Sequence, residues 1–417
     1  MFRAVEDMPV ASRNQSPQGS LPLLLAVLRD RGPLPLAALG EYLGVSRSKV
    51  IQDVETLVRQ GVVTRGGRAP SRGGRPSSLV GLAPDLYYVG VDIGATSLAV
   101  AVTNGYLDVI DFVEEESDIR TGPHAVLGRA VQLVGKVTSG LRHPRLLGAG
   151  VGVPGPVSFR DGRPDAPPLM PGWDGFRVRD VLAQRLSVPV TVDNDVNIMA
   201  LGEMRKGVAR GASNFMFIKV GTGIGCGIVV DGAIHRGANG CAGDIGHIRV
   251  GSSTAPCHCG RIGCLEAEFG GAALAQHAIR AAETGESPIL AEWLREQGTL
   301  TAADVGRASA AGDQVSNALI RQGGQLIGQV LAGLVNFFNP SLVVFGGGLA
   351  NLGHLLLAEI RSVTFNRSTP LATSDLSIIV GELGAQTGVV GAALCASEQF
   401  AAEIAMTPAP PPKEVEP

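Results

Sequence analysis

Hydrophobic positions recur with two different periods, and the change of period divides the chain near residue 84. Residues 36–63 show helical spacing, with apolar side chains three or four positions apart. From Tyr87 onward, short apolar runs suited to buried strands alternate with helical patterns. We therefore expect a small helical module over residues 20–83 in front of an α/β body.

The segment 36–63 predicts a helix, a tight turn and a second helix. Gly44 permits the turn, and Ser46 is a favourable N-cap for the second helix. The positions expected to face the core are Leu36, Leu39 and Leu43, followed by Val50, Val54, Leu57 and Val58. The opposite face of the second helix begins with Arg47, Ser48, Lys49 and Gln52. A helix that enters the major groove presents such side chains to base edges and phosphates, so these four are candidate DNA-binding residues.

Residues 62–82 consist of two short apolar runs around an arginine-rich loop. The loop carries Arg65, Arg68, Arg72 and Arg75. We interpret it as a β-wing whose Arg75, in the sequence Gly–Arg–Pro, enters a minor groove. Helices and wing together predict a winged helix-turn-helix domain that binds double-stranded DNA. The alternative is a small helical protein-interaction domain with a solvated basic loop.

Charge distribution supports the DNA-binding interpretation. The chain has 417 residues, of which 45% are hydrophobic, so it is long enough for two or three domains. Its net charge is −3. Residues 1–88 hold eleven Lys and Arg against seven Asp and Glu, whereas the remainder is acidic. A basic module on an acidic body is typical of a nucleic-acid reader with a second activity. Because apolar runs are short and Glu6 and Asp7 oppose a secretion signal, we expect a cytoplasmic protein without membrane partners.

Three of the six cysteines fall within eight residues, as Cys257-x-Cys259-x4-Cys264, with His247 ten residues upstream. Such spacing indicates a metal site rather than a disulfide framework. Zn²⁺ takes about four soft ligands in a tetrahedron, which leaves no position for water, so the ion would be structural. His258 is a rival ligand, and reduced, buried or redox-active cysteines are the alternative to a metal.

Two segments of the body share one plan, residues 88–102 and 217–230. Each consists of an apolar strand, a Gly/Thr turn and a second apolar strand. A pair of such hairpins can present backbone N–H groups and Thr hydroxyls to phosphate from two sides. The same turns would, however, be needed by the hairpins themselves.

The motifs of the body resemble the ROK family of repressors, open reading frames and kinases over about residues 20–400. The resemblance rests on these segments: DIGAT (92–96), GVGVPGPV (150–157), DNDVNIMALGE (193–203), GTGIGCG (221–227), GANGCAGDIGH (237–247), CHCGRIGCLE (257–266) and VVFGGG (343–348). It implies a multidomain protein with an actin/hexokinase-like, duplicated ribonuclease H-like α/β body of two lobes. The expected division is a disordered arm over 1–19, the winged helix-turn-helix over 20–83, a small lobe over 84–198 plus 385–405, a large lobe with the zinc site over 199–384, and a disordered tail over 406–417.

The resemblance also implies roles for individual residues. Sugar hydroxyls would be contacted by Asn194, Asp195, Asp244, His247 and Glu266, with Asp195 at the position of the catalytic base. Zinc would be held by His247, Cys257, Cys259 and Cys264. Nucleotide would be approached by Asp92, Gly94, Thr96, Gly221, Thr222, Gly223, Gly346 and Gly347, with Asp92 holding Mg²⁺ through water. From its own sequence context, DNDVN, Asp195 also suits a turn or a helix cap.

Departures from the kinase pattern bear on activity. Family kinases usually read Asp-x-Gly-Gly-Thr where this chain has Ala95, and Glu-x-Gly-His where it has Asp244. We therefore favour a sugar-responsive DNA-binding regulator, in the role of a repressor, that acts as a homodimer or homotetramer and responds to a sugar or sugar phosphate. There are two alternatives. One is an active ATP-dependent hexose kinase with a DNA-binding domain, and the other is an interaction scaffold with a vestigial cleft. ATP with Mg²⁺ stays open as a cofactor.

Overall fold

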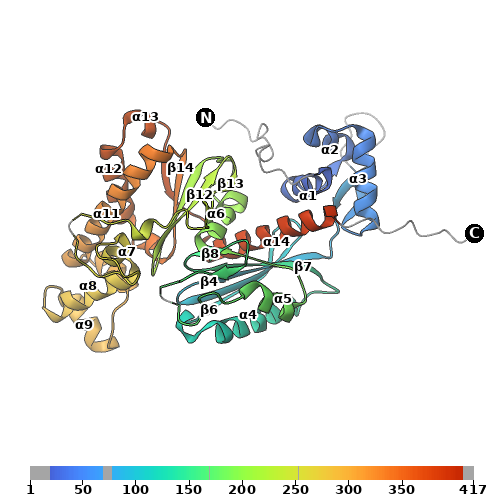
Figure 1. The fold of residues 1–417 in the computed structure, drawn as a ribbon. Helices are drawn as coiled ribbons and strands as arrows, with labels where there is room; N and C mark the ends of the chain where they lie inside the picture. The colour runs from blue at the N-terminus through green and yellow to red at the C-terminus, as the bar shows by residue number, and fades with distance from the viewer. Residues whose placement is uncertain (1–18, 69–77, 169, 252, 407–417) are drawn as a thin grey trace, which may run out of the picture.

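A computed structural model describes residues 19–68, 78–168, 170–251 and 253–406. The described chain forms an N-terminal group of helices and a body of two α/β lobes (Figure 1). The N-terminal group, residues 20–82, is called the head below. The first lobe is built on a sheet from residues 86–194 and the second lobe on a sheet from residues 215–380.

Both lobes contain a five-stranded sheet with the same topology. The first sheet has the order β10-β7-β4-β5-β6 and comprises β4 (Leu86–Ile93), β5 (Ser97–Asn104), β6 (Val109–Glu116), β7 (Arg145–Val153) and β10 (Val190–Asn194). The second has the order β13-β12-β11-β14-β15 and comprises β11 (Phe215–Val220), β12 (Ile224–Val230), β13 (Ala233–Ile234), β14 (Leu342–Gly346) and β15 (Ser377–Val380). In each sheet the first three strands in chain order form an antiparallel meander. The two later strands run parallel to the first strand of that meander. The predicted repeat thus corresponds to the hairpins β4–β5 and β11–β12.

The outer helices cover one face of each sheet. On the first lobe these are α4 (Pro123–Thr138) and α5 (Val178–Leu186), which share a core with β4, β5 and β7. On the second lobe they are α7 (Leu265–Phe269), α8 (Gly271–Glu283), α9 (Pro288–Gln297), α10 (Ala302–Ala310), α11 (Gln314–Phe338), α12 (His354–Arg367) and α13 (Pro370–Thr373). Alternation along β11 divides its side chains between two cores: Met216 and Ile218 face the outer helices, whereas Phe215 and Phe217 face inward.

Two helices, α6 (Asp195–Lys206) and α14 (Thr387–Met406), fill the space between the sheets. Glycines allow an unusually close approach of their backbones. A Cβ on Gly90 of β4 would lie 1.9 Å from the carbonyl oxygen of Val389, and one on Gly391 would lie 1.7 Å from that of Ile198. Because no other residue fits at these crossings, α14 is held against both the first sheet and α6.

The head contains three helices and a small sheet. Its elements are α1 (Ser20–Arg31), β1 (Leu34–Pro35), α2 (Leu36–Leu43), α3 (Arg47–Arg59), β2 (Val63–Arg68) and β3 (Ser78–Leu82), with the sheet order β1-β3-β2. Ser46 caps α3 as predicted, since its hydroxyl accepts a hydrogen bond from the Lys49 amide. The prediction for Val58 was wrong: it is 39% exposed, and Asp53 is buried instead. Successive side chains are rotated by about 100° around the axis of α3, which places Val58 beyond Val54, at the edge of the buried face of the helix.

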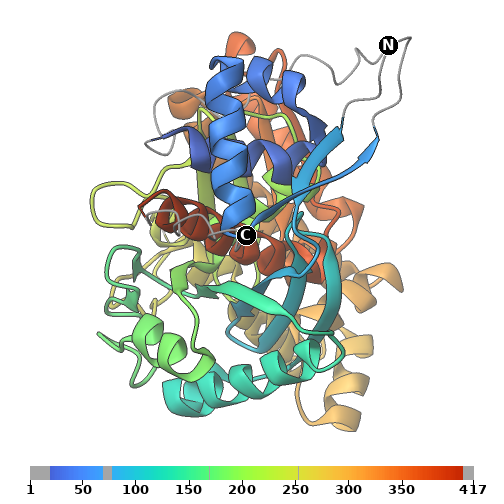
Figure 2. The same cartoon turned by 90° about the vertical axis from the view of Figure 1, so that its right-hand side faces the viewer.

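The head packs directly on the body. Its core continues into Phe400, Ala401 and Ile404 of α14 and into Leu86 and Leu147 of the first lobe. Arg145 also donates a hydrogen bond of 2.7 Å to the carbonyl oxygen of Gly61. Figure 2 shows α3 standing above the end of α14.

Three predicted boundaries shift. The division between residues 198 and 199 falls inside α6, which is continuous because its buried face packs against α14 and both sheets. The predicted tail begins one residue too early, since α14 ends at Met406. Gly19, assigned to the arm, is the N-cap of α1. The remainder of both predicted terminal segments lies outside the described residues.

One helix of the described chain, Gly384–Met406, is long and apolar enough to cross a membrane by length and composition alone. In the structure α14 is a core helix, with residues 387–397 buried between the first sheet and α6. Its apolar composition is therefore explained by packing inside the protein.

Candidate functional site

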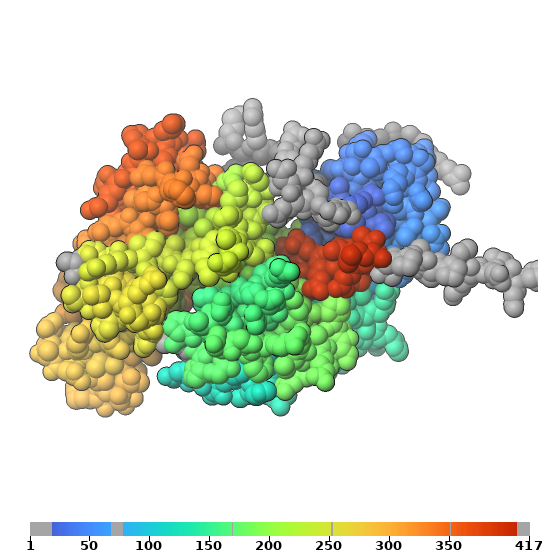
Figure 3. All heavy atoms as spheres, viewed as in Figure 1, coloured from blue at the N-terminus to red at the C-terminus, as the bar shows by residue number. Residues whose placement is uncertain are grey.

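A cavity of about 830 Å³ lies between the two lobes. Figure 3 shows the lobes meeting, with the second lobe in yellow to orange and the first in teal to green. The first lobe contributes residues 94–97 and 154–156, and the second contributes residues 221–226 and 240–244. A cavity of this size accommodates a ligand larger than one monosaccharide. It is called the cleft below.

All five predicted sugar-binding residues line the cleft. They are Asn194, Asp195, Asp244, His247 and Glu266. Asn194 and Asp195 stand where β10 ends and α6 begins. Asp244 precedes the short helical turn Ile245–His247, His247 is its last residue, and Glu266 belongs to α7. Three separate segments of the chain thus bring hydrogen-bonding side chains to one cavity.

The cap of α6 is Asn194 rather than Asp195. Its Oδ1 accepts hydrogen bonds from the amides of Val196 and Asn197, and its Nδ2 donates to the carbonyl oxygen of Gly155 at 2.8 Å. Asp195 Oδ1 accepts from the Val196 amide at 2.9 Å. Asn194 is therefore fixed in place, while the second oxygen of Asp195 is free of backbone contacts.

That second oxygen is engaged by Lys219, which was not among the predicted site residues. Lys219 Nζ donates a hydrogen bond to Asp195 Oδ2, and the two side chains are 21% and 7% exposed. Burial lowers the pKa of Lys219, but the negative charges of Asp195 and Asp92 outweigh it and leave the pKa raised. A lysine inside the apolar strand sequence FIKV (217–220) was the signal that could have revealed it.

Asp92 lies at the end of β4, close to this ion pair. Its Oδ1 is buried and has no hydrogen-bond partner within the described part of the chain. Burial raises the pKa of Asp92 to about 7, with Lys219 lowering it and the Asp195 charge raising it. The carboxyl group therefore holds a proton far more tightly than an ordinary aspartate does.

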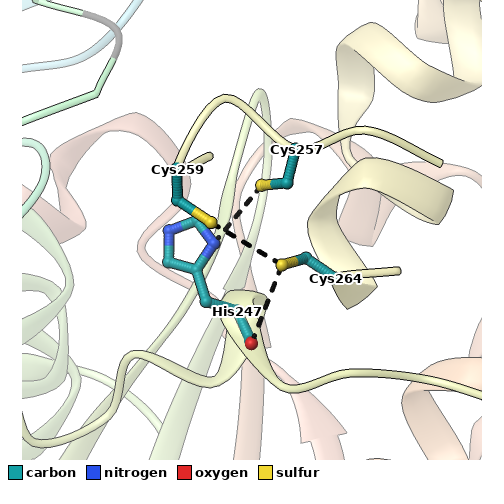
Figure 4. Close-up of side chains that lie close together, drawn as sticks. All are labelled: His247, Cys257, Cys259 and Cys264. Carbon is teal, nitrogen blue, oxygen red and sulfur yellow. Dashed lines mark hydrogen bonds between the residues drawn. The ribbon is translucent and has the colours of Figure 1, made fainter. Parts of the chain in front are cut away.

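Four side chains from the second lobe converge on one point (Figure 4). The ligand atoms of His247, Cys257, Cys259 and Cys264 all lie within 4.8 Å of one another. The Cys259 and Cys264 sulfurs are 3.7 Å apart, and Cys257 Sγ is 3.5 Å from His247 Nδ1. With Zn–S bonds of about 2.3 Å, sulfur ligands of a tetrahedral zinc stand about 3.8 Å apart, so the donor set fits this ion.

The cysteine cluster is directly connected to the cleft. His247 turns Nδ1 toward Cys257, and its Nε2 lies 3.8 Å from Asp244 Oδ1 on the cleft side. Glu266 follows Cys264 by two residues, and its Oε2 accepts a hydrogen bond of 3.0 Å from the Ile224 amide. The cluster therefore sets the position of two cleft side chains.

The predicted nucleotide-binding residues are only partly brought together. Gly94, Thr96, Gly221, Thr222 and Gly223 line the cleft. Asp92, Gly346 and Gly347 are not among the residues that line the cleft, although the adjacent Gly348 is. Gly347 has a φ of +87° and its Cβ would approach the Val220 carbonyl oxygen within 2.6 Å, so a turn explains this glycine.

Four of the predicted DNA-binding residues gather at one exposed end of the head. Arg47, Ser48, Lys49 and Gln52 are all exposed at the N-terminal end of α3. Lys49 Nζ is paired with the buried carboxylate of Asp53. Arg75 lies outside the described residues.

The repeated sheets and the cleft between them define the class of this protein: a two-lobed α/β protein of the actin/hexokinase-like type. Residues 88–399 match the ROK family, and the chain belongs to that family.

Both kinases and repressors are among the similar proteins. A glucokinase from Halalkalibacterium halodurans is 34% identical over 318 residues, which cover 76% of this chain and 96% of the kinase. A xylose repressor from Caldicellulosiruptor bescii is 28% identical over 374 residues, 88% of this chain and 93% of the repressor. A ROK family transcriptional regulator homologous to the E. coli MLC protein superposes with a TM-score of 0.79 at 22% identity, over 93% of this chain and 97% of that one, and so shares the fold. The repressor match thus extends over more of this chain than the glucokinase match does.

Proposed function

We propose that this protein is a sugar-responsive transcriptional repressor of carbohydrate metabolism genes. The sugar occupies the cleft, and the head binds an operator in double-stranded DNA. The observation that carries the proposal is a single helix, α6, that starts in the cleft and ends against the head. Its first residue is Asp195, and its last turn contains Arg205, which contacts α1.

This helix provides a physical route from sugar to DNA. Arg205 donates a hydrogen bond of 2.6 Å to the carbonyl oxygen of Arg29 and pairs with Asp30 at 3.2 Å. Next to α6, the helix α14 contributes Ala401 to the core of the head. A sugar that draws the lobes together displaces α6 and α14, and the head follows. A coupling free energy of about 1–3 kcal/mol changes operator affinity roughly 5–150-fold.

The head functions as a winged helix-turn-helix domain in this proposal. Helices α2 and α3, joined by a turn at Gly44, form the helix-turn-helix, and the hairpin β2–β3 forms the wing. Arg47, Ser48 and Gln52 reach base edges and phosphates of the major groove, and Arg75 enters the minor groove. Two half-sites about one helical turn apart require two heads, which supports a homodimer or a homotetramer.

In the cleft, carboxylates and an amide recognise the sugar. Each carboxylate of Asp195, Asp244 and Glu266 can accept hydrogen bonds from two hydroxyls. His247 addresses a further hydroxyl through Nε2 while Nδ1 binds Zn²⁺. Zinc, when bound to His247, Cys257, Cys259 and Cys264, supplies a rigid structural link and no open position for water.

The experiment starts from a DNA sequence selected by the full-length protein out of a random library. Its dissociation constant is then measured at fixed salt with and without glucose, xylose, N-acetylglucosamine and their phosphates. We expect one sugar to change the dissociation constant at least about 5-fold. A protein that binds DNA with no response to any sugar that it binds would contradict the proposal.

An active hexose kinase is the second candidate, because Asp195 faces the cleft and a glucokinase is 34% identical. ATP with Mg²⁺ would then lie beside Thr96 and Thr222, both of which line the cleft. Phosphorylation of hexoses by the purified protein, lost in Asp195→Asn, would establish this activity.

A further inference from the structure

We propose that the ammonium group of Lys219 takes the place of a divalent cation between Asp195 and Asp92, so that the cleft binds an uncharged sugar without phosphorylating it. This inference rests on the proposed function and specifies its ligand class. It is carried by the geometry of one ion pair, by the strand that presents it, and by the charges around the cleft.

The second sheet is shaped to aim Lys219 at Asp195. The cross-strand neighbours of Lys219 on β11 are Gly225 of β12 and Gly346 of β14. Neither has a side chain, so the lysine stem meets no competing group on its face of the sheet. A Cβ on Gly225 would lie 2.9 Å from the Val196 side chain, which shows that this face looks toward the first turn of α6. Lys219 is thus directed at the residue in the position of the catalytic base.

The ion pair occupies the oxygen that catalysis would need. A general base accepts the proton of the attacking hydroxyl on a carboxylate oxygen within hydrogen-bond distance. Asp195 Oδ1 already accepts from the Val196 amide, and Oδ2 accepts from the Lys219 ammonium. A sugar hydroxyl can still donate to a remaining lone pair, which supports binding. Transfer of its proton would break a buried charge pair.

The same ammonium group affects the second carboxylate. Lys219 acts electrostatically on both Asp195 and Asp92. Without a cation, these two electrostatically interacting carboxyl groups would form a suitable position for Mg²⁺, which proteins bind through one or two carboxylates and water. Phosphoryl transfer uses such an ion to neutralise developing charge on the phosphate. With the positive charge of Lys219 already in place, a divalent ion meets repulsion there.

The charges along the cleft argue against a phosphorylated ligand. Four acidic side chains line it: Glu114, Asp195, Asp244 and Glu266. Lys219 is the single Lys or Arg among the lining residues of the described chain, and Asp195 already neutralises it. A phosphate group with about two negative charges would meet uncompensated repulsion, whereas hydroxyl groups find four hydrogen-bond acceptors.

Three variants of the full-length protein test the inference. Lys219→Met removes the charge and keeps much of the stem, Lys219→Arg is the matched control that keeps the charge, and Lys219→Met/Asp195→Asn removes both members of the pair. Melting temperature is measured with and without millimolar Mg²⁺ in the absence of sugar. We expect Mg²⁺ to raise the melting temperature of Lys219→Met by about 2 °C or more and to leave wild type and Lys219→Arg unchanged.

Sugar binding and turnover are measured on the same proteins. Wild type should bind a neutral sugar more tightly than its phosphate and should not phosphorylate it with ATP and Mg²⁺. Lys219→Met should phosphorylate it about 10-fold or more above the wild-type background, and the double variant should lose this gain. Either gain in Lys219→Met, of Mg²⁺ binding or of phosphorylation, supports the inference.

Phosphorylation by wild type, tighter binding of a sugar phosphate, or a folded Lys219→Met that gains neither property would overturn the inference. Should Lys219→Met fail to fold, the turnover and ligand preference of wild type still decide it. Absence of any sugar binding would instead defeat the proposed function. The Mg²⁺ measurement needs no sugar, so it would still test the role of Lys219.

Discussion

Arg205 and Asp30 form an ion pair across the boundary between the body and the head. Arg205 Nη1 lies 3.2 Å from Asp30 Oδ1, and the Arg205 side chain is 14% exposed. Asp30 also pairs with Arg29 at 2.8 Å, so it keeps a partner when Arg205 is removed. Because α6 starts at Asp195 in the cleft, this pair would transmit a ligand-induced movement of α6 to the base of the head.

Arg205→Ala should therefore separate sugar binding from the DNA response. We expect the dissociation constant for sugar to change less than about 2-fold, since the cleft lies at the other end of α6. The effect of sugar on operator affinity should fall from about 5-fold or more to below about 2-fold. Calorimetry measures the first quantity and fluorescence anisotropy on labelled operator the second. Arg295→Ala, on an exposed position of α9, is the matched control, and a full sugar response in Arg205→Ala would exclude this route.

Operator affinity should depend on the first turn of α3 rather than its last. Arg47→Ala removes an exposed guanidinium and should weaken operator binding by about 1–3 kcal/mol without lowering the melting temperature. Arg59→Ala, at the exposed C-terminal end of the same helix, is the control and should have little effect. Binding measured over a range of salt concentrations checks both. Equal losses in the two variants would contradict the placement of α3 in the major groove.

Local patterns were sufficient to predict much of the architecture. The hairpins β4–β5 and β11–β12, the cap at Ser46 and the convergence of Cys257, Cys259 and Cys264 all depend on residues close in sequence. The cleft residues were predicted from the resemblance of their motifs to the ROK family, and in the structure they line the cavity between the lobes.

Contacts between distant segments could not be predicted in this way. Lys219 meets Asp195 across 24 residues, and Arg205 meets the carbonyl oxygen of Arg29 across 176. No periodic pattern in the sequence predicts either contact, because each contact depends on how a strand or helix is placed in three dimensions. Val58 illustrates a second limit of prediction from sequence. Helical spacing predicts which face of a helix is buried, but the packing partner decides how wide the buried face is.

Loss of zinc should disturb sugar recognition through His247 and Glu266. Cys259→Ser should reduce the zinc content from about one ion per chain to none and weaken sugar binding about 10-fold, since the metal fixes the imidazole. Metal analysis and calorimetry measure the two effects. Cys241→Ser, an exposed cysteine outside the cluster, is the control and should retain its zinc. A folded, metal-free wild-type protein would rule out the site.

The buried carboxyl group of Asp92 should give the protein a characteristic dependence of stability on pH. Its pKa is raised to about 7 in the folded protein, chiefly by burial, from an ordinary value of 3.8. Between these two pH values the folded state binds more protons than the unfolded state, so stability falls as the pH rises and levels off above about 7.

Asp92→Asn removes this titration while keeping the shape of the side chain. The free energy of unfolding of the variant, relative to wild type, should increase by about 2–3 kcal/mol between pH 5 and pH 8, because each unit of pKa shift corresponds to about 1.4 kcal/mol. Denaturant unfolding at several pH values measures the difference, with the exposed Asp111→Asn as the matched control. A difference that stays constant or decreases with pH would mean that the pKa of Asp92 is not raised in the folded protein.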